Sequence, residues 1–163
     1  MAKKALIIGV ASQDGSFLAE FLVEKGYDVT GTVRHSTNFF HENIQHLYGK
    51  IKIKAADLID QESISYVVRE DKPDEVYNIA AQSVPGDSWN QPFATGEVTA
   101  LGPVRTLEAV RQFTPDAKFY QATSREIYGN IEAGFANEQT LIDANNPYGI
   151  AKAYAHMMTR CYR

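Results

Sequence analysis

Residues 5–17, ALIIGVASQDGSF, constrain the fold of this chain more than any other stretch. The stretch opens as a buried apolar strand and ends as the start of a helix, with Gly9 and Gly15 in the turn between them. Glycine permits a sharp turn and close helix–strand packing, and the free amides of a helix N-terminus attract an anion. The pattern predicts a strand–turn–helix unit that cradles the phosphates of a dinucleotide. The expected contacts are Gly9, Ser12, Gln13, Asp14 and Gly15.

Ser12 is the irregular position in this turn. It stands where a third glycine would let the backbone approach the diphosphate. Serine can tolerate the turn and bond a phosphate oxygen itself; at a positive φ it would instead strain the turn by about 1–2 kcal/mol and weaken binding. A strand–turn–helix unit that holds no nucleotide is the alternative.

Strand-like and helical patterns alternate along the whole chain. The expected strands are 4–11, 27–34, 50–58, 74–82 and 116–123, and the expected helices are 16–26, 41–49, 61–71, 95–113 and 147–163. This alternation predicts a doubly wound parallel α/β sheet, a Rossmann-type domain over residues 1–163. Ligands of such sheets bind beyond the carboxyl ends of the strands. Apolar stripes are expected on the first helix (Phe17, Leu18, Phe21, Leu22) and on the fourth (Val98, Leu101, Val104, Leu107, Val110).

Composition narrows the class of protein further. The 163 residues, 44% hydrophobic and 22% charged, fit one soluble domain. A net charge of −4 without a basic run argues against a nucleic acid or an anionic membrane as partner. The apolar runs are too short to span a bilayer and no leader is recognised, so a cytoplasmic location is expected. The single cysteine, Cys161, fits a reducing compartment. No metal site is expected.

Arg34 follows the second expected strand, where NAD-binding folds usually carry an acid that grips the ribose 2′-hydroxyl. A guanidinium can pair with a 2′-phosphate and stack on adenine, which favours NADP over NAD. A solvated surface arginine is the alternative. Asp57 and Leu58, after the third expected strand, are placed to meet the adenine.

Tyr148 and Lys152 lie four residues apart in NPYGIAKAY, on one face of a helix that Asn146 caps. An ammonium near a phenol lowers the phenol's pKa, so the tyrosine can take a proton from a sugar hydroxyl while hydride leaves the same carbon. After the fifth expected strand, Ser124 can bond that hydroxyl. Glu126, in a water-poor pocket that raises its pKa, can act as a second base. A packed tyrosine, a surface lysine and an exposed loop acid are the alternatives.

Taken together, these segments resemble the extended short-chain dehydrogenase/reductase family, along essentially the whole chain. The resemblance rests on the glycine turn and on VYNIAAQS, SWNQP, LEAVRQF, KFYQA, QATSREIYG and PYGIAK. Within that family the chain is most similar to nucleotide-sugar 4,6-dehydratases. This implies an NADP cofactor, a nucleotide-sugar substrate such as GDP-mannose, and a homo-oligomer paired through the two long helices. It also implies cofactor contacts from Ala80, Ala81 and Gln82, and substrate contacts from Ser83 and Ser88.

The reaction implied by the resemblance is a redox-neutral loss of water. Tyr148, supported by Lys152, would deprotonate the C4 hydroxyl of the mannosyl unit as hydride passes to NADP. Glu126 would take the C5 proton and help expel the C6 hydroxyl. Hydride would then return to C6 and leave a 4-keto-6-deoxy sugar. Ser124 takes the place of the family's usual threonine.

Several residues depart from the family's pattern. Arg125 replaces a small serine, and a cation there can pair with Glu126 and lower its pKa. His35 replaces an arginine, and Pro103 falls inside a long helix. The family's chains are considerably longer, so a substrate domain is expected outside residues 1–163. The alternatives are a diverged cofactor-binding module without activity, or an epimerase or reductase of the same family; Glu126 favours the dehydratase over the latter.

Overall fold

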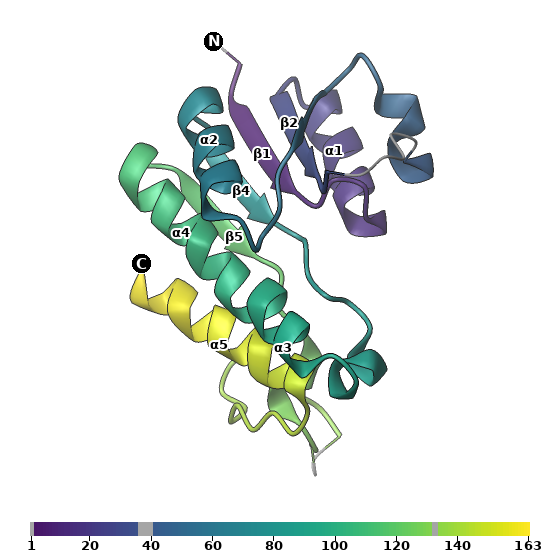
Figure 1. Ribbon diagram of the computed structural model, residues 1–163, viewed down its shortest axis with the longest axis vertical. Coiled ribbons are helices and arrows are strands. Elements are labelled where there is room, and N and C mark those ends of the chain that lie inside the picture. Colours follow the sequence, from purple (N-terminus) through teal and green to yellow (C-terminus); the bar gives the residue numbers. More distant parts are fainter. Residues whose placement is uncertain (1, 36–40, 132–133) are drawn as a thin grey trace.

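A five-stranded parallel sheet forms the centre of the computed structural model, which describes residues 2–35, 41–131 and 134–163 (Figure 1). The strands are β1 (Lys4–Ile8), β2 (Asp28–Val33), β3 (Lys52–Ala55), β4 (Glu75–Asn78) and β5 (Lys118–Gln121). Their order in the sheet is β3-β2-β1-β4-β5. This order confirms the doubly wound fold, and it places the reversal of strand order between β1 and β4, where such sheets bind ligands.

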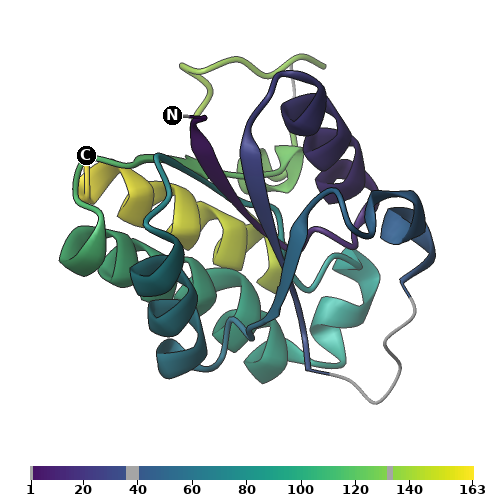
Figure 2. The same cartoon turned by 90° about the horizontal axis from the view of Figure 1, so that it is seen from above.

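Helices cover the sheet on both faces (Figure 2). One face carries α1 (Gln13–Glu24) and the 3₁₀ helix η1 (Glu42–Leu47), and the other carries α2 (Gln61–Asp71), α4 (Gly102–Phe113) and α5 (Pro147–Cys161). Shorter turns lie near the carboxyl edge of the sheet: η2 (Pro85–Trp89), α3 (Pro92–Thr95), the π-helical η3 (Gly96–Leu101) and η4 (Arg125–Tyr128). In the described part of the chain, no helix has the length and apolar character needed to cross a membrane.

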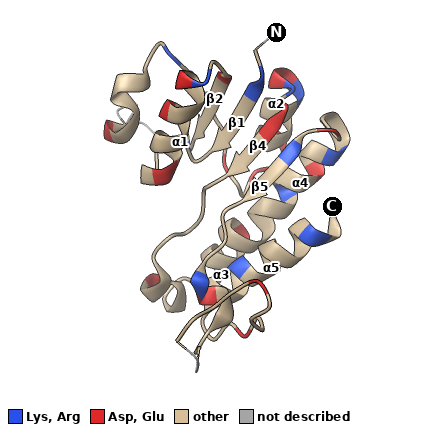
Figure 3. Ribbon diagram, turned by 180° about the vertical axis from the view of Figure 1, so that it is seen from behind, with Lys and Arg blue, Asp and Glu red and all other residues tan. Residues whose placement is uncertain are grey.

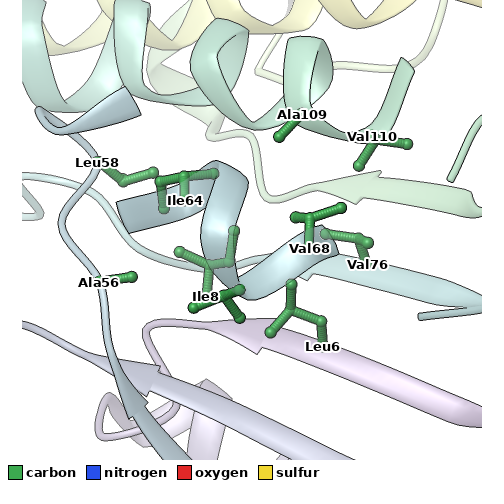
Figure 4. Packing of buried hydrophobic residues seen from close by; sticks show 10 residues of the cluster. Leu6, Ile8, Ala56, Leu58, Ile64, Val68, Val76, Ala109 and Val110 are labelled. Carbon is green, nitrogen blue, oxygen red and sulfur yellow. The ribbon is translucent and has the colours of Figure 1, made fainter. Parts of the chain in front are cut away.

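Strand β1 is buried on both faces. Leu6 and Ile8 belong to the cluster packed under α2 and α4 (Figure 4). Ala5 and Ile7 belong to the cluster under α1 and η1. Apolar burial stabilises by about 25 cal/mol per Å². Because apolar burial stabilises β1 on both faces, the turn that follows this strand starts from a firmly held strand end.

Helix α1 differs from its predicted form. It begins at Gln13 rather than at Ser16, because Ser12 caps it. Its buried residues are Gly15, Ser16, Ala19 and Leu22. Phe17 and Phe21 are 60% and 52% exposed, so the stripe predicted through them is wrong. The small residues face the sheet because close packing of this helix leaves no room for aromatic rings.

The long helix expected over 95–113 forms as α3, η3 and α4 in succession. Pro103 has no amide and its ring crowds the preceding turn. The π-helical segment before it relieves this crowding, and the Gly102 amide bonds to Glu97 O, five residues back. The inserted residue shifts the helix face, so Leu101 is 38% exposed while Leu107 and Val110 stay buried. The predicted single stripe is therefore wrong at Leu101.

Candidate cofactor and catalytic site

The turn formed by residues 9–15 (the glycine turn) has no room for a side chain at either of its two glycines. Gly9 has φ +89°, and a Cβ there would lie 2.8 Å from Ala80 Cβ. A Cβ on Gly15 would lie 2.4 Å from Gly9 O. Glycine is therefore required at both positions, at the first for conformation and contact and at the second for close packing of α1 against β1.

Ser12 fits this turn without strain. Its φ of −73° and ψ of 166° are extended values open to any residue. Its hydroxyl donates to Gly9 O at 2.8 Å and accepts from the Gly15 amide at 3.1 Å. The serine is thus the N-cap of α1, and the strain considered at a positive φ does not arise.

The start of α1 offers free amides to a ligand. Within the described residues, the amides of Ala11, Gln13 and Asp14 have no hydrogen-bond partner. The Gln13 and Asp14 side chains are exposed. Such amides, together with the positive end of the helix dipole, bind phosphate groups.

The residues that follow β2 and β3 present different groups at the carboxyl edge of the sheet. Arg34 is exposed and forms no ion pair or hydrogen bond with any described residue. Asp57 is half-buried, and its Oδ1 accepts from the Ile59 amide at 3.2 Å. Leu58 is 4% exposed in the core, and its carbonyl accepts from Arg105 Nη1 at 3.2 Å. Its side chain is therefore unavailable to adenine, contrary to expectation.

The segment after β4 lies against the glycine turn. Ala80 abuts Gly9, and the amides of Ile79 and Ala80 both bond to Ile8 O at 3.0 Å. Ala81 is half-buried. Gln82 donates from Nε2 to Val84 O at 2.9 Å, but its buried Oε1 has no partner among the described residues. A buried acceptor without a donor is costly, and this oxygen is free to accept a hydrogen bond from a donor on a ligand.

The two serines expected to contact a substrate differ in exposure. Ser83 is exposed. Ser88 is 0% exposed, and its hydroxyl donates to Pro85 O at 2.6 Å inside η2. The structure therefore corrects the expectation for Ser88, because its hydroxyl serves the turn and has no accessible surface.

Helix α5 carries the tyrosine and lysine into the interior. The predicted cap is confirmed, because Asn146 Oδ1 accepts from the Gly149 amide at 2.8 Å. Tyr148 and Lys152 are 8% and 3% exposed, so neither is a surface residue. Lys152 Nζ lies 5.9 Å from the centre of the Tyr148 ring and donates to Ala122 O at 2.8 Å. Burial lowers the pKa of Lys152 to about 8.

The carboxylate of Glu126 is held on both oxygens. Asn146 Nδ2 donates to Oε2 at 2.8 Å, and Arg125 Nη1 lies 3.0 Å from Oε1. The hydrogen bond from Asn146, and then that from Arg125, lowers the pKa of Glu126. The expected rise in the pKa of Glu126 is therefore wrong, and the expected pairing with Arg125 is confirmed. Figure 3 shows acidic and basic residues adjoining beside the start of α5.

Two adjoining elements thus bring the four expected catalytic residues together. Ser124 caps η4, its Oγ accepting from the Glu126 amide at 3.2 Å. Lys152 reaches the carbonyl of Ala122, which precedes that turn. Sequence reasoning assigned Asn146 only a capping role and missed its bond to Glu126. An amide side chain, with a donor and an acceptor at one end, is the signal that could have indicated a second partner.

Comparison with known proteins identifies the family. A family model described as GDP-mannose 4,6 dehydratase matches residues 6–163. The chain belongs to the GDP-mannose 4,6-dehydratase family. The resemblance drawn from the motifs is thereby confirmed.

Individual members of the GDP-mannose 4,6-dehydratase family cover the chain almost completely. The GDP-mannose 4,6-dehydratase of Vibrio cholerae serotype O1 is 42% identical over 99% of this chain and 46% of its own length. That of Homo sapiens is 40% identical over 98% of this chain and 45% of its own. The chain spans about half the length of the curated relatives it matches.

A solved structure agrees with the fold. The UDP-glucose 4-epimerase of Thermus thermophilus, in complex with NAD, is 29% identical and superimposes with a TM-score of 0.87. The match covers 98% of this chain and 50% of the epimerase chain. This likeness supports the Rossmann-type architecture seen in the strand order.

Proposed function

We propose that residues 1–163 form the NADP-binding and catalytic domain of a GDP-mannose 4,6-dehydratase, a lyase that converts GDP-mannose to GDP-4-keto-6-deoxymannose and water. The observation that carries the proposal is one sheet edge with two features. It has a glycine turn with free amides, and an interior tyrosine–lysine pair beside a carboxylate. The names of the family and of its relatives support the dehydratase assignment and the substrate.

The described residues fit a dinucleotide. The turn at Gly9, with its positive φ, and the free amides at the start of α1 would hold the phosphates. The unpaired Gln82 Oε1 would accept a hydrogen bond from the cofactor. The residues proposed to hold the cofactor are Gly9, Ser12, Gln13, Asp14, Gly15, Arg34, Asp57, Ala80, Ala81, Gln82, Tyr148 and Lys152, with Leu58 through its backbone. NAD in the T. thermophilus structure supports a nicotinamide cofactor, and Arg34 favours NADP. Bound NADP supplies reversible acceptance of hydride.

Tyr148 and Glu126 would share the proton transfers of the reaction. The Tyr148 phenolate oxygen would take the proton of the sugar C4 hydroxyl, and Lys152, mostly protonated at pH 7 with a pKa of about 8, would stabilise that phenolate before the transfer. The Ser124 hydroxyl bonds the C4 oxygen. Glu126, ionised at neutral pH, would take the C5 proton and give it to the departing C6 hydroxyl, which leaves as water. The proton taken up by Tyr148 would then be delivered to C5. Ser83 remains the proposed substrate contact after β4.

A cofactor-binding module without turnover is a second candidate. One observation favours it: the Arg125–Glu126 pair and the lowered pKa of Glu126 weaken that carboxylate as a base. An epimerase, which moves a hydride without an elimination, would have less use for a carboxylate at this place.

Turnover in the presence of NADP separates these candidates. The chain is incubated with NADP and GDP-mannose, and loss of water from the sugar is followed by mass spectrometry, with Glu126→Gln as the matched control. The dehydratase predicts a product from the wild type only, and NADPH binding by both proteins. NADPH binding without a product supports the module, and absence of both rejects both candidates.

Self-association through the continuous helical run of η3 and α4 and through α5 is proposed on the basis of exposed apolar residues on η3 and α5. These include Leu101, Tyr154 and Met157, which are 38%, 41% and 48% exposed. Exposed apolar patches are typical of interfaces. Sedimentation velocity should show a dimer that Met157→Lys dissociates; a monomer at all concentrations would reject the interface.

A further inference from the structure

We propose that Asn146 is a positioning residue that fixes the Glu126 carboxylate relative to the Tyr148–Lys152 face of α5. The inference rests on the proposed function, because the position of the carboxylate matters for turnover only if Glu126 is the base. The contact itself is a property of the chain and can be tested without turnover.

One amide side chain joins the two elements. Asn146 Oδ1 accepts from the Gly149 amide at 2.8 Å, which starts α5. Its Nδ2 donates to Glu126 Oε2 at 2.8 Å, which belongs to η4. Both ends of the amide are engaged, so the side chain has little freedom to rotate without losing a bond. Any shift of the carboxylate is therefore coupled to the first turn of α5.

The backbones meet at the same place. A Cβ on Gly149 would lie 2.5 Å from Glu126 O, so the first turn of α5 packs directly on the backbone of Glu126. This close approach sets the distance between η4 and α5. The bond from Asn146 then selects the orientation of the Glu126 side chain at that distance.

Arg125 is the weaker of the two partners in fixing position. Its side chain is 61% exposed, whereas that of Glu126 is 25% exposed. Exposed ion pairs contribute little, because water screens them and long side chains lose entropy on pairing. The Asn146 bond is partly buried and involves a short side chain. It is also the larger cause of the lowered pKa of Glu126.

The arrangement leaves the carboxylate competent to accept a proton. Each carboxylate oxygen has two acceptor sites, and the described contacts use one on each. Titratable groups on the elements packed against η4 include Tyr148 and Lys152 in the first turns of α5, and Asp143, whose amide donates to Ile127 O at 3.0 Å. Of the described charged groups, only Arg125 contributes to the shift in the pKa of Glu126.

Three variants test the inference. Asn146→Ser keeps an oxygen that can cap α5 but lacks the amide donor. Asn146→Asp keeps the cap and the shape but turns a second carboxylate toward Glu126. Arg125→Gln removes the exposed partner and leaves Asn146 in place. The pKa of Glu126 is followed by carbon-13 NMR, the cap by the Gly149 amide shift, and the fold by thermal unfolding.

The expected result is a higher pKa of Glu126 in Asn146→Ser and a still higher one in Asn146→Asp, with the Gly149 signal and the unfolding midpoint close to wild type. Arg125→Gln should raise the pKa of Glu126 by a smaller amount than either Asn146 variant does. An unchanged pKa of Glu126 in both Asn146 variants would overturn the inference. If Asn146→Ser does not fold, Asn146→Asp alone decides the question by the same criterion.

Turnover separates this inference from the proposed function. If the wild type converts GDP-mannose, Asn146→Ser should shift the pH profile of kcat and lower kcat more than it changes KM. A wild-type profile and kcat in that variant would overturn the positioning role. If the wild type shows no turnover while the pKa responds as expected, the proposed function fails and the coupling of Asn146 to Glu126 stands.

Discussion

The glycine turn after β1 and the turn of residues 122–129 after β5 (the β5 turn) share one type of serine hydrogen bond, but they offer different groups to a ligand. Each contains a serine whose hydroxyl accepts a hydrogen bond from a backbone amide: Ser12 from Gly15 at 3.1 Å, and Ser124 from Glu126 at 3.2 Å. The glycine turn offers backbone amides to a ligand. The β5 turn offers side chains, and partners elsewhere in the chain hold them.

The difference shows how each turn is specified. Steric limits fix the glycine turn, because a Cβ at Gly15 would collide with Gly9 O of the same turn and a Cβ at Gly9 would collide with Ala80, which follows β4. The β5 turn depends on Asn146, which lies twenty residues beyond Glu126 in the chain. Changes in the glycine turn should therefore affect folding and cofactor binding together, whereas changes near the β5 turn should affect proton chemistry with little effect on the fold.

The largest effect is expected for Gly15→Ala. The new Cβ would lie 2.4 Å from Gly9 O, so α1 must move away from β1. Overpacking of this kind costs about 3 kcal/mol of the free energy of unfolding. Urea denaturation measures this loss, and NADPH binding should disappear with it.

Gly96→Ala is the control for Gly15→Ala. Its Cβ would meet nothing within 4 Å, and its φ is not positive, so alanine should stabilise the helix slightly. Equal losses in the two variants would contradict the steric account of the glycine turn.

Lys152→Met should stabilise the fold by about 1–2 kcal/mol at neutral pH while removing turnover. Burial lowers the pKa of Lys152 from 10.5 to about 8, so the unfolded chain binds more protons than the folded chain between these values. Wild-type stability should therefore rise with pH across this window. Lost bonding to Ala122 O offsets part of the gain in the variant.

Urea denaturation at about pH 7 and about pH 9.5 measures this effect of Lys152. The advantage of Lys152→Met should be largest at the lower pH and should shrink at the higher one. A difference between the two proteins that does not change with pH would show that Lys152 is not buried as an ammonium.

Ser12→Ala should lower the free energy of unfolding by about 1 kcal/mol, and Ser12→Gly by only a few tenths, because the N-cap bond to Gly15 is lost. Since Ser12 is unstrained, glycine should not tighten the binding of NADPH. A tenfold tighter complex with Ser12→Gly, measured by fluorescence titration, would show that the hydroxyl obstructs the cofactor.

Arg125→Gln should have the smallest effect on stability, within about 0.5 kcal/mol, because the pair with Glu126 is exposed. The pKa of Glu126 should rise, since one of its two donors to the carboxylate is weakened. Thermal unfolding and NMR titration measure the two quantities. A large loss of stability would mean that the β5 turn is fixed by its own residues.

The same contrast explains what could be predicted from the sequence. The doubly wound parallel sheet, the two glycines of the turn and the cap by Asn146 follow from patterns readable in the sequence, and they were predicted correctly. The face of α1 was predicted correctly only at Leu22, because close packing on the sheet turns the small residues of the first turns inward and leaves Phe17 exposed. The burial of Ser88 was missed because it depends on the packing of η2 against α5. The bond from Asn146 to Glu126 was missed because it joins two separate elements, whereas the lowering of the pKa of Glu126 by the adjacent Arg125 was expected.

Titration of the chain with NADPH and NADH, by fluorescence or calorimetry, tests the central claim most directly: a dinucleotide lies on the glycine turn with its 2′-phosphate at Arg34. The account predicts one NADPH bound per chain, more tightly than NADH, and loss of that preference in Arg34→Ala, whose exposed side chain has no structural role in the described contacts. No binding at millimolar NADPH, or a preference that survives Arg34→Ala, would contradict it.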